Sequence, residues 1–248
     1  MGAFVLEEGP IPVLRCRPLL EVPGVAHGFS TRRGPDGVPF DLGPAEAPPA
    51  VGARRAAFLR ACGVAAPPLV LRQVHGANVV RAAEVGPEAT PEGDAAVWFR
   101  GEAQGRAPAV RTADCVPVLL ADRRGRGVAA VHAGWRGVAA GIAGAAVRAL
   151  AQRGIPPADL VAALGPAILD CCYTVGPEVL EAVGLPGEGP GRLDLHARLR
   201  AQLCGEGIGE AAIHAAPWCT RCHPELFFSY RREREGAGRQ MAVIGPSP

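Results

Sequence analysis

Short apolar runs that end in polar residues recur along the chain, and they predict β-strands. Three of them are LVLRQVHG at 69–76, AVRTADCVPVLLAD at 109–122 and GVAAVHAGWRG at 127–137. Each is rich in apolar or β-branched residues and passes into a turn that contains glycine, aspartate or proline. Because a polar side chain stands at or near the end of each run, we expect the strand ends to converge on one site.

Helical patterns fill much of the second half. The alanine-rich run VAAGIAGAAVRALAQRG at 138–154 follows HAGWRG, and arginines and a glycine close it, as they close many helices. It predicts one helix that a tight glycine turn joins to the preceding strand. We also expect helices at 177–183, which begins with proline, and at 194–207. ELFFSYRRE at 225–233 and RQMAVIG at 239–245 predict two strands joined by a short turn.

Two segments dense in glycine and proline, 34–50 and 184–191, predict surface loops. Apolar patterning continues on both sides of each, and no internal repeat or charge block divides the chain. We therefore expect one domain over 1–248. Its fold class is α+β: a layered α/β domain with mixed β-sheets flanked by helices.

The charge and the basic residues exclude several functions. A net charge of +2 and the lack of long basic runs argue against nucleic acid as a partner. All 26 basic residues are arginine, since the sequence contains no lysine. This excludes lysine Schiff-base chemistry and the lysine-bearing P-loop. Any anion that a side-chain cation binds here is bound by guanidinium, which makes bidentate contacts to phosphate.

The N-terminal residues and the cysteines suggest a location. Glu7, Glu8 and nearby prolines interrupt what a secretory signal would need, and no apolar stretch approaches the roughly 18 to 20 residues of a membrane span. We expect a cytoplasmic protein with no membrane partner. In such a reducing compartment the eight cysteines are thiols, metal ligands or nucleophiles rather than disulfides, and most should be buried.

His75, Cys115 and His132 form the candidate reactive group, because each stands beside a residue that ends or bends a strand. Two imidazoles and one thiolate suit zinc, and three ligands leave a fourth position open for water, as in catalytic sites. The three residues lie far apart in the sequence, which leaves two alternatives open. The histidines could be hydrogen-bonded strand ends without metal, or Cys115 could be a nucleophile with a histidine as its base.

Several long motifs occur in order over nearly the whole chain. They are HGFSTRRG at 27–34, QVHG at 73–76, ADCVPVLL at 113–120, AVHAGWRGVAAGI at 130–142, GPAILDCCYTVGPEV at 165–179, CT at 219–220 and FFSYRRE followed by GRQ at 227–240. With these motifs the chain resembles the YfiH or laccase-domain family of FAMIN-related purine nucleoside phosphorylases, also labelled polyphenol oxidases.

The resemblance implies that His75, Cys115 and His132 are catalytic and bind Zn²⁺. It also implies phosphorolysis of adenosine, inosine, guanosine and 5'-methylthioadenosine, with deamination of adenosine, so that the partners are a purine nucleoside and phosphate. Copper fits less well, because the chain has only six histidines and a multicopper oxidase needs more, in paired patterns. One alternative that the family implies is a cysteine-dependent hydrolase or amidase that edits peptidoglycan precursors; polyphenol oxidase, the older name, is another.

Five further residues are candidates for substrate contact. Arg136 follows the turn that opens a helix, where backbone N–H groups and the helix dipole favour an anion such as phosphate. Arg32 and Arg231 match family motifs and are candidates for contact with phosphate or ribose. Ser30 and Gln73 are candidates for lining the pocket, although ordinary turn hydrogen bonding explains them equally well.

Two aspartates near the candidate ligands have different expected roles. Asp114 points away from Cys115 in an extended segment, so we expect it to hold a neighbouring loop rather than act as a base. Asp94 keeps a family position, but Trp98 stands where the family commonly has threonine. The contact that this threonine would make is therefore in doubt.

The remaining cysteine motifs predict little chemistry. CTRCH at 219–223 matches the C-x-x-C-H pattern of covalent haem attachment. That chemistry belongs to exported proteins, and no export signal is expected here. Cys171 and Cys172 are expected to be packing thiols beside a turn.

Overall fold

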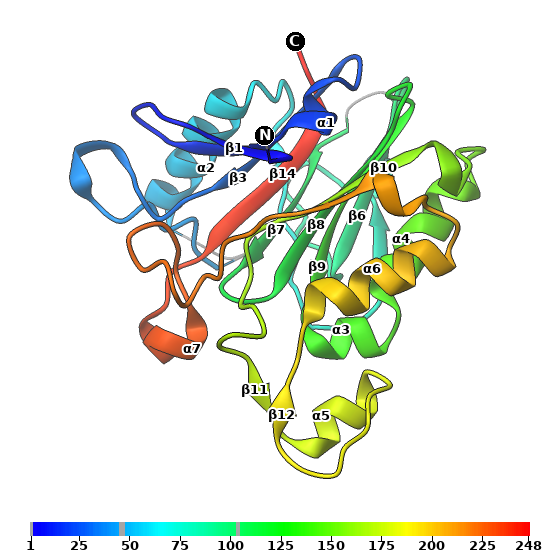
Figure 1. The fold of residues 1–248 in the computed structure, drawn as a ribbon. Helices are drawn as coiled ribbons and strands as arrows, with labels where there is room; N and C mark the ends of the chain where they lie inside the picture. The colour runs from blue at the N-terminus through cyan, green and yellow to red at the C-terminus, as the bar shows by residue number, and fades with distance from the viewer. Residues whose placement is uncertain (1, 45–47, 103–104) are drawn as a thin grey trace.

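The computed structural model describes residues 2–44, 48–102 and 105–248, and its strands form two six-stranded sheets (Figure 1). The first has the order β1(Phe4–Glu7), β2(Val13–Cys16), β3(Val25–Ser30), β14(Gln240–Pro246), β7(Ala107–Thr112), β4(Pro68–Leu69). The second has the order β13(Ile213–Ala215), β10(Leu160–Leu164), β8(Val116–Asp122), β9(Gly127–Ala133), β6(Ala95–Phe99), β5(Val79–Arg81). A small ribbon pairs β11(Thr174–Val175) with β12(Gly191–Arg192).

The two sheets stack face to face, and helices cover their outer faces. In β8, Leu119 belongs to the core between the sheets, whereas Val118 and Leu120 face the helices, as the two-residue period of a strand requires. In β14, Ala242 likewise faces the other sheet and Val243 the opposite side. The architecture is therefore helix, sheet, sheet, helix. Antiparallel and parallel pairs both occur, so the expected class of a layered fold with mixed sheets is confirmed.

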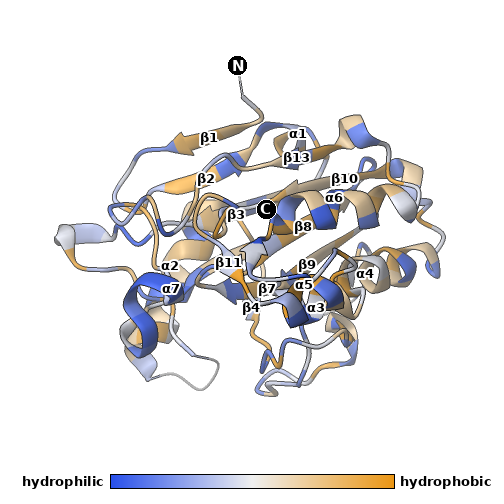
Figure 2. Cartoon of the chain, turned by 60° about the horizontal axis from the view of Figure 1, so that its bottom comes forward, coloured by the Kyte–Doolittle hydropathy of each residue, from blue (hydrophilic) through white to orange (hydrophobic). Residues whose placement is uncertain are grey.

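Helices α4(Ile142–Ala151) and α6(Leu195–Gly205) cover the second sheet, and α2(Pro49–Cys62) covers the first. Helix α6 alternates between hydrophobic and hydrophilic residues (Figure 2), and Leu199 and Leu203 on its apolar face are buried. The shorter α-helices are α1(Arg17–Leu20), α3(Trp135–Ala139), α5(Pro177–Ala182) and α7(Tyr230–Glu233). The 3₁₀ turns are Pro35–Gly37, Ala82–Glu84, Pro157–Asp159, Glu210–Ala212 and Arg234–Gly236. Within the described ranges no helix is long and apolar enough to cross a membrane.

Several sequence expectations hold and others are wrong. The helices expected near 177–183 and 194–207 and the last strand are present. The single helix expected over 138–154 is two helices, because Gly141 adopts a left-handed conformation with φ of 76° between them. The strand expected at 225–233 is wrong: Ser229 caps α7 by accepting a hydrogen bond from the Arg232 backbone. The expected loop 184–191 ends where β12 begins.

The loop expected over 34–50 ends early, because Pro49 already begins helix α2. Residues 45–47 of that loop lie outside the described residues. Helix α2 was not expected, and neither were the three N-terminal strands. The helix buries Arg55, which donates to the Leu42 carbonyl at 2.9 Å. This contact joins the helix to the loop before it, 13 residues earlier in the chain, and local patterning does not reveal it.

Candidate metal centre

The sheet brings the three candidate ligands together. Cys115 lies in the turn between β7 and β8, and His132 lies near the end of β9. Antiparallel pairing of β8 with β9 sets Pro117 opposite His132. Cys115 precedes Pro117 by two residues, so it lies beside the same histidine. His75 joins them from the loop after β4, and its ring centroid lies 4.7 Å from that of His132. The ligand atoms of all three residues lie within 4.8 Å of one another.

Asp94, at the start of β6, organises this group. Its carboxylate accepts the backbone N–H groups of Val74, His75 and Gly76 at 3.2, 2.9 and 2.7 Å. Its Oδ1 also lies 2.8 Å from Nδ1 of His132. A carboxylate at that distance holds the proton on Nδ1 and leaves Nε2 to bind a metal. Burial raises the pKa of Asp94, but these hydrogen bonds outweigh it and keep the carboxyl ionised.

The Asp94 contacts also fix an unusual backbone. His75 has a φ of 62°, in the left-handed region that few residues other than glycine occupy. Three consecutive N–H groups that point at one carboxylate hold the loop in that shape. The His75 side chain remains exposed, so it approaches the ligand cluster from the solvent side.

Cys115 and His132 perturb each other strongly. Burial raises the pKa of the Cys115 thiol, but the charge of His132 and hydrogen bonds from both histidines lower it to about 6. Burial lowers the pKa of His132, but the thiolate and Asp94 raise it to about 9. Without metal the pair is a thiolate and an imidazolium at neutral pH. A metal ion would replace the imidazolium proton, which matches a site built for a cation.

Gly134 leaves room for a metal between the ligands. A Cβ at this position would lie 2.9 Å from Sγ of Cys115 and 3.0 Å from Cδ2 of His75. Both distances are shorter than ordinary contacts, so any side chain would fill the space that faces the sulfur. The donor set and this space fit a zinc ion with an open fourth position.

A cavity of about 860 Å³ opens in front of the three ligands, a volume suited to a small-molecule substrate. Its charge is strongly positive, because six arginines line it and Asp114 is the only carboxylate among the described lining residues. Trp135, Tyr173 and Tyr230 supply aromatic rings to the wall. The lining arginines are Arg72, Arg111, Arg136, Arg231, Arg234 and Arg239. Such a cavity favours an anion together with a flat, aromatic group.

Three of the five expected substrate residues line this cavity. The Arg136 guanidinium stacks 4.3 Å from the centre of the Trp135 ring. Arg231 donates from its side chain to the Thr174 carbonyl at 3.0 Å. Gln73 also lines the wall, but its amide both donates to and accepts from the Arg111 backbone, so it holds two loops together.

Arg32 and Ser30 lie elsewhere: neither is among the lining residues of the cavity. Arg32 pairs with Glu233 at 2.7 Å and stacks on Phe228, which ties α7 to the first sheet. Ser30 is buried, and its hydroxyl accepts the Met241 backbone N–H at 2.9 Å. Their placement supports structural roles.

Asp114 has the expected supporting role. It accepts the Thr220 hydroxyl and the Arg231 backbone N–H, both at 2.6 Å. The carboxylate thus binds two distant segments to the turn that carries Cys115. Trp98, at the position of the family threonine, is buried between the sheets.

The helix dipole that we expected beside Arg136 is weaker than the sequence indicates. Helix α3 has five residues, Trp135–Ala139, because the chain turns at Gly141. A helix this short develops little macrodipole. The cationic groups that face this cavity are therefore mainly guanidinium groups, and the sequence motifs identified only some of them.

Comparison with known proteins agrees with the geometry. The family model described as multi-copper polyphenol oxidoreductase laccase matches residues 26–247. A purine nucleoside phosphorylase of Streptomyces coelicolor is 41% identical over 229 residues, which cover 86% of this chain and 92% of that protein. An adenosine deaminase, RL5, from an unknown prokaryotic organism is 39% identical over 153 residues, 57% of this chain and 58% of that protein. The crystal structure of YlmD from Geobacillus stearothermophilus superposes with a TM-score of 0.85 at 30% identity and covers both chains fully.

Proposed function

The chain belongs to the multi-copper polyphenol oxidoreductase laccase family, and we propose that it is a zinc-dependent purine nucleoside phosphorylase that also deaminates adenosine. One observation carries the proposal: a three-ligand centre of His75, Cys115 and His132 faces a cavity rich in arginine and aromatic rings. Relatives named purine nucleoside phosphorylase and adenosine deaminase support both activities.

The substrates are adenosine, inosine, guanosine or 5'-methylthioadenosine, together with phosphate. In phosphorolysis a phosphate oxygen forms a bond to C1' of the ribose while the bond from C1' to N9 breaks. The bonding pair leaves with the purine, which takes up the proton that the phosphate gives up, and the products are the free base and ribose-1-phosphate, or 5-methylthioribose-1-phosphate from 5'-methylthioadenosine. Arg136 and Arg231 bind and orient the phosphate. The rings of Trp135 and Tyr173 offer flat surfaces for the base.

Deamination uses the same cavity with water in place of phosphate. The water oxygen forms a bond to C6 of adenine, the C6 amino group leaves as ammonia, and adenosine becomes inosine. An activity of this kind needs a polar centre beside the base, which the three-ligand group provides. The relative named adenosine deaminase supports it.

Zinc is the metal that best matches the ligands. His75, Cys115 and His132 would hold it, and when bound it supplies Lewis acidity at its open position. Asp94 sets the tautomer of His132. A multicopper centre would need more imidazoles, but only two of the six histidines lie in this group. The ligand set therefore supports zinc over the copper chemistry in the family description.

A product-identified assay tests the function. Purified zinc-loaded protein is incubated with each nucleoside, with and without phosphate, and the products are separated by chromatography. We expect adenine and ribose-1-phosphate from adenosine, some inosine, and no product with Cys115→Ala. A fully zinc-loaded protein that converts no purine nucleoside would refute the proposal.

A second candidate is a cysteine-dependent hydrolase or amidase acting on peptidoglycan precursors. The lowered pKa of Cys115 and the chain of contacts from Cys115 through His132 to Asp94 favour it, because nucleophilic cysteines use such arrangements. The two candidates respond to zinc in opposite ways. Zinc activates the phosphorylase but occupies the thiolate that the hydrolase needs.

We further propose that residues 1–248 form one domain and that the protein acts in the cytoplasm, without nucleic acid or membrane partners. The low net charge supports the first exclusion. The cores on both faces of the second sheet support a single domain, because they join elements from both halves of the chain.

A further inference from the structure

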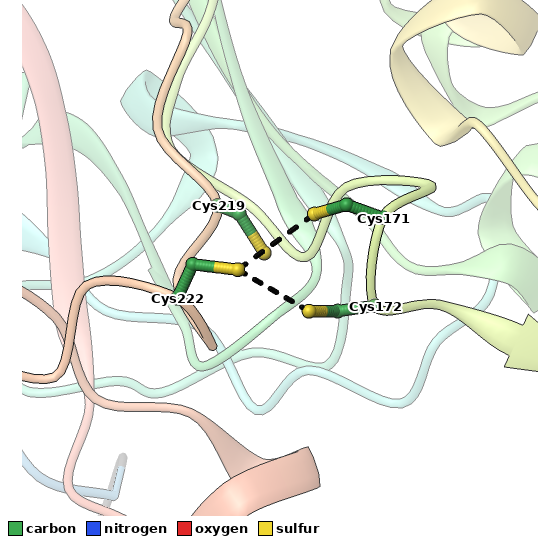
Figure 3. Close-up of side chains that lie close together, drawn as sticks. All are labelled: Cys171, Cys172, Cys219 and Cys222. Carbon is green, nitrogen blue, oxygen red and sulfur yellow. Dashed lines mark hydrogen bonds between the residues drawn. The ribbon is translucent and has the colours of Figure 1, made fainter.

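Four cysteines meet on two loops away from the cavity lining (Figure 3). Cys171 and Cys172 lie in the turn between β10 and β11, and Cys219 and Cys222 lie between β13 and α7. Their sulfurs all lie within 4.8 Å of one another. Sγ of Cys222 is 3.8 Å from that of Cys171 and 3.3 Å from that of Cys172. The two pairs lie about fifty residues apart in the sequence, so the cysteine motifs did not indicate this group.

These separations match one metal ion. A tetrahedral zinc with Zn–S bonds of about 2.3 Å separates its sulfurs by roughly 3.8 Å. A disulfide needs an S–S distance of about 2.0 Å, and all four cysteines are free thiols. An iron–sulfur cluster distributes its four cysteines over two or four irons, which would spread the sulfurs further apart. We propose that Cys171, Cys172, Cys219 and Cys222 bind one Zn²⁺ in a second, structural site.

The burial of the four residues supports a metal. Cys171 and Cys222 are exposed, Cys172 is half-buried and only Cys219 is buried. Cys171 and Cys172 are therefore not the packing thiols that the sequence suggested. Clustered thiols at a surface are prone to oxidation, whereas a bound zinc keeps them reduced and orders their loops. Four thiolates complete the coordination, as in structural zinc sites.

The surrounding backbone already holds the loops in place. Residues Ala167 and Cys219 pair in a parallel β-bridge, and the Leu169 N–H donates to Sγ of Cys219 at 3.5 Å. Hydrogen bonds to sulfur stabilise the thiolate form that a metal requires. Zinc with four thiolates carries a net charge of −2, and the Arg221 side chain, which hydrogen-bonds to Cys172, offsets part of it. The guanidinium of Arg232 donates to the carbonyls of Thr220 and Arg221 at 2.8 and 2.9 Å.

The second site would brace the wall of the first cavity. Tyr173 lines that cavity directly after Cys172, and the Arg231 guanidinium lies 5.1 Å from its ring centre. On the other loop, Thr220 follows Cys219 and donates to Asp114 at 2.6 Å. A zinc ion that joins the two loops therefore fixes a lining aromatic residue and the turn that carries Cys115.

Metal counting tests the proposal. Protein without an affinity tag is purified under reducing conditions, saturated with Zn²⁺ and dialysed, and zinc per chain is measured by mass spectrometry. We expect two zinc ions for the wild type and one each for Cys171→Ser/Cys222→Ser and Cys115→Ala. Cys204→Ser, which alters a half-buried thiol outside both groups, should keep two. In cobalt-loaded protein, the double variant should lose most of the sulfur-to-metal absorption and Cys115→Ala little of it.

Wild-type measurements decide the matter even if the double variant does not fold. Alkylation mapped by peptide mass spectrometry should show Cys171 and Cys222 protected by zinc and reactive after chelation. One zinc per chain that disappears in Cys115→Ala would overturn the proposal. So would equal alkylation of Cys222 with and without zinc, or a disulfide within the group in freshly reduced protein. The count does not depend on catalysis, so its failure is distinct from failure of the proposed phosphorylase.

Discussion

Replacement of Asp94 by asparagine removes one charge and one acceptor while it keeps the shape of the side chain. In the wild type each carboxylate oxygen accepts two donors at distances of 2.7 to 3.2 Å. An amide has one oxygen, so its NH₂ group must face two N–H donors in either orientation. The loop of His75 or the ring of His132 would lose its support.

The size of the effect follows from these contacts. Loss of a carboxylate that orients a metal-binding histidine typically lowers metal affinity about 10- to 100-fold. That range is about 1.4 to 2.7 kcal/mol in binding free energy. Each lost hydrogen bond to a charged group also costs about 1.5 to 3 kcal/mol of folding stability. Asp94→Asn should therefore weaken zinc binding at the His75 site by at least tenfold and lower the melting temperature.

Competition with a chromophoric chelator measures the affinity, and Asp122→Asn is the matched control. Asp122 is equally buried, but its carboxylate pairs with Arg126 at 2.8 Å and does not touch the metal ligands. We expect the control to lose stability and keep its zinc affinity. If Asp94→Asn binds zinc as tightly as the wild type, Asp94 does not orient the ligands and the assignment is wrong.

Three further predictions concern the same centre. In metal-free protein, iodoacetamide should alkylate Cys115 with an apparent pKa near 6. The alkylation rate should therefore stay level from pH 7 to 9 and fall below pH 6. A midpoint near pH 9 would show that His132 does not stabilise the thiolate. Arg136→Gln should raise KM for phosphate about tenfold or more, the scale of a lost charge-assisted contact, whereas Arg32→Gln should leave it unchanged; equal effects would reject the assignment of Arg136. Gly134→Ala should weaken zinc binding in a chelator titration without unfolding the protein. Gly52→Ala, whose added Cβ meets open space, should leave the zinc affinity unchanged. Unaltered zinc affinity in Gly134→Ala would contradict the proposed position of the metal beside Gly134.

The sequence predicted the group of His75, Cys115 and His132 because strand periodicity is local. Each residue follows an apolar run, and the pairing of adjacent strands β8 and β9 brings the last two together. His75 was a candidate on the same ground, but the strand expected at 69–76 ends at Leu69, so His75 lies in a loop rather than at the end of a strand. The sequence did not indicate that Asp94 organises the group, because its carboxylate accepts hydrogen bonds from backbone N–H groups some twenty residues away.

Other features depend on contacts that no local pattern encodes. The cysteine group needs two loops about fifty residues apart, which the β-bridge between Ala167 and Cys219 brings together. Arg32 belongs to a strong motif, yet its partner Glu233 lies at the far end of the chain. The break at Gly141 follows from a left-handed residue that an alanine-rich helical pattern conceals.

Formation of ribose-1-phosphate from adenosine and phosphate, followed by ³¹P NMR during zinc titration, tests the central claim most directly. The wild type should form the sugar phosphate in proportion to the zinc held by His75, Cys115 and His132, and Cys115→Ala should form none. A wild-type protein whose zinc site is full but which forms no ribose-1-phosphate, or a Cys115→Ala variant that forms it at the wild-type rate, would contradict the claim.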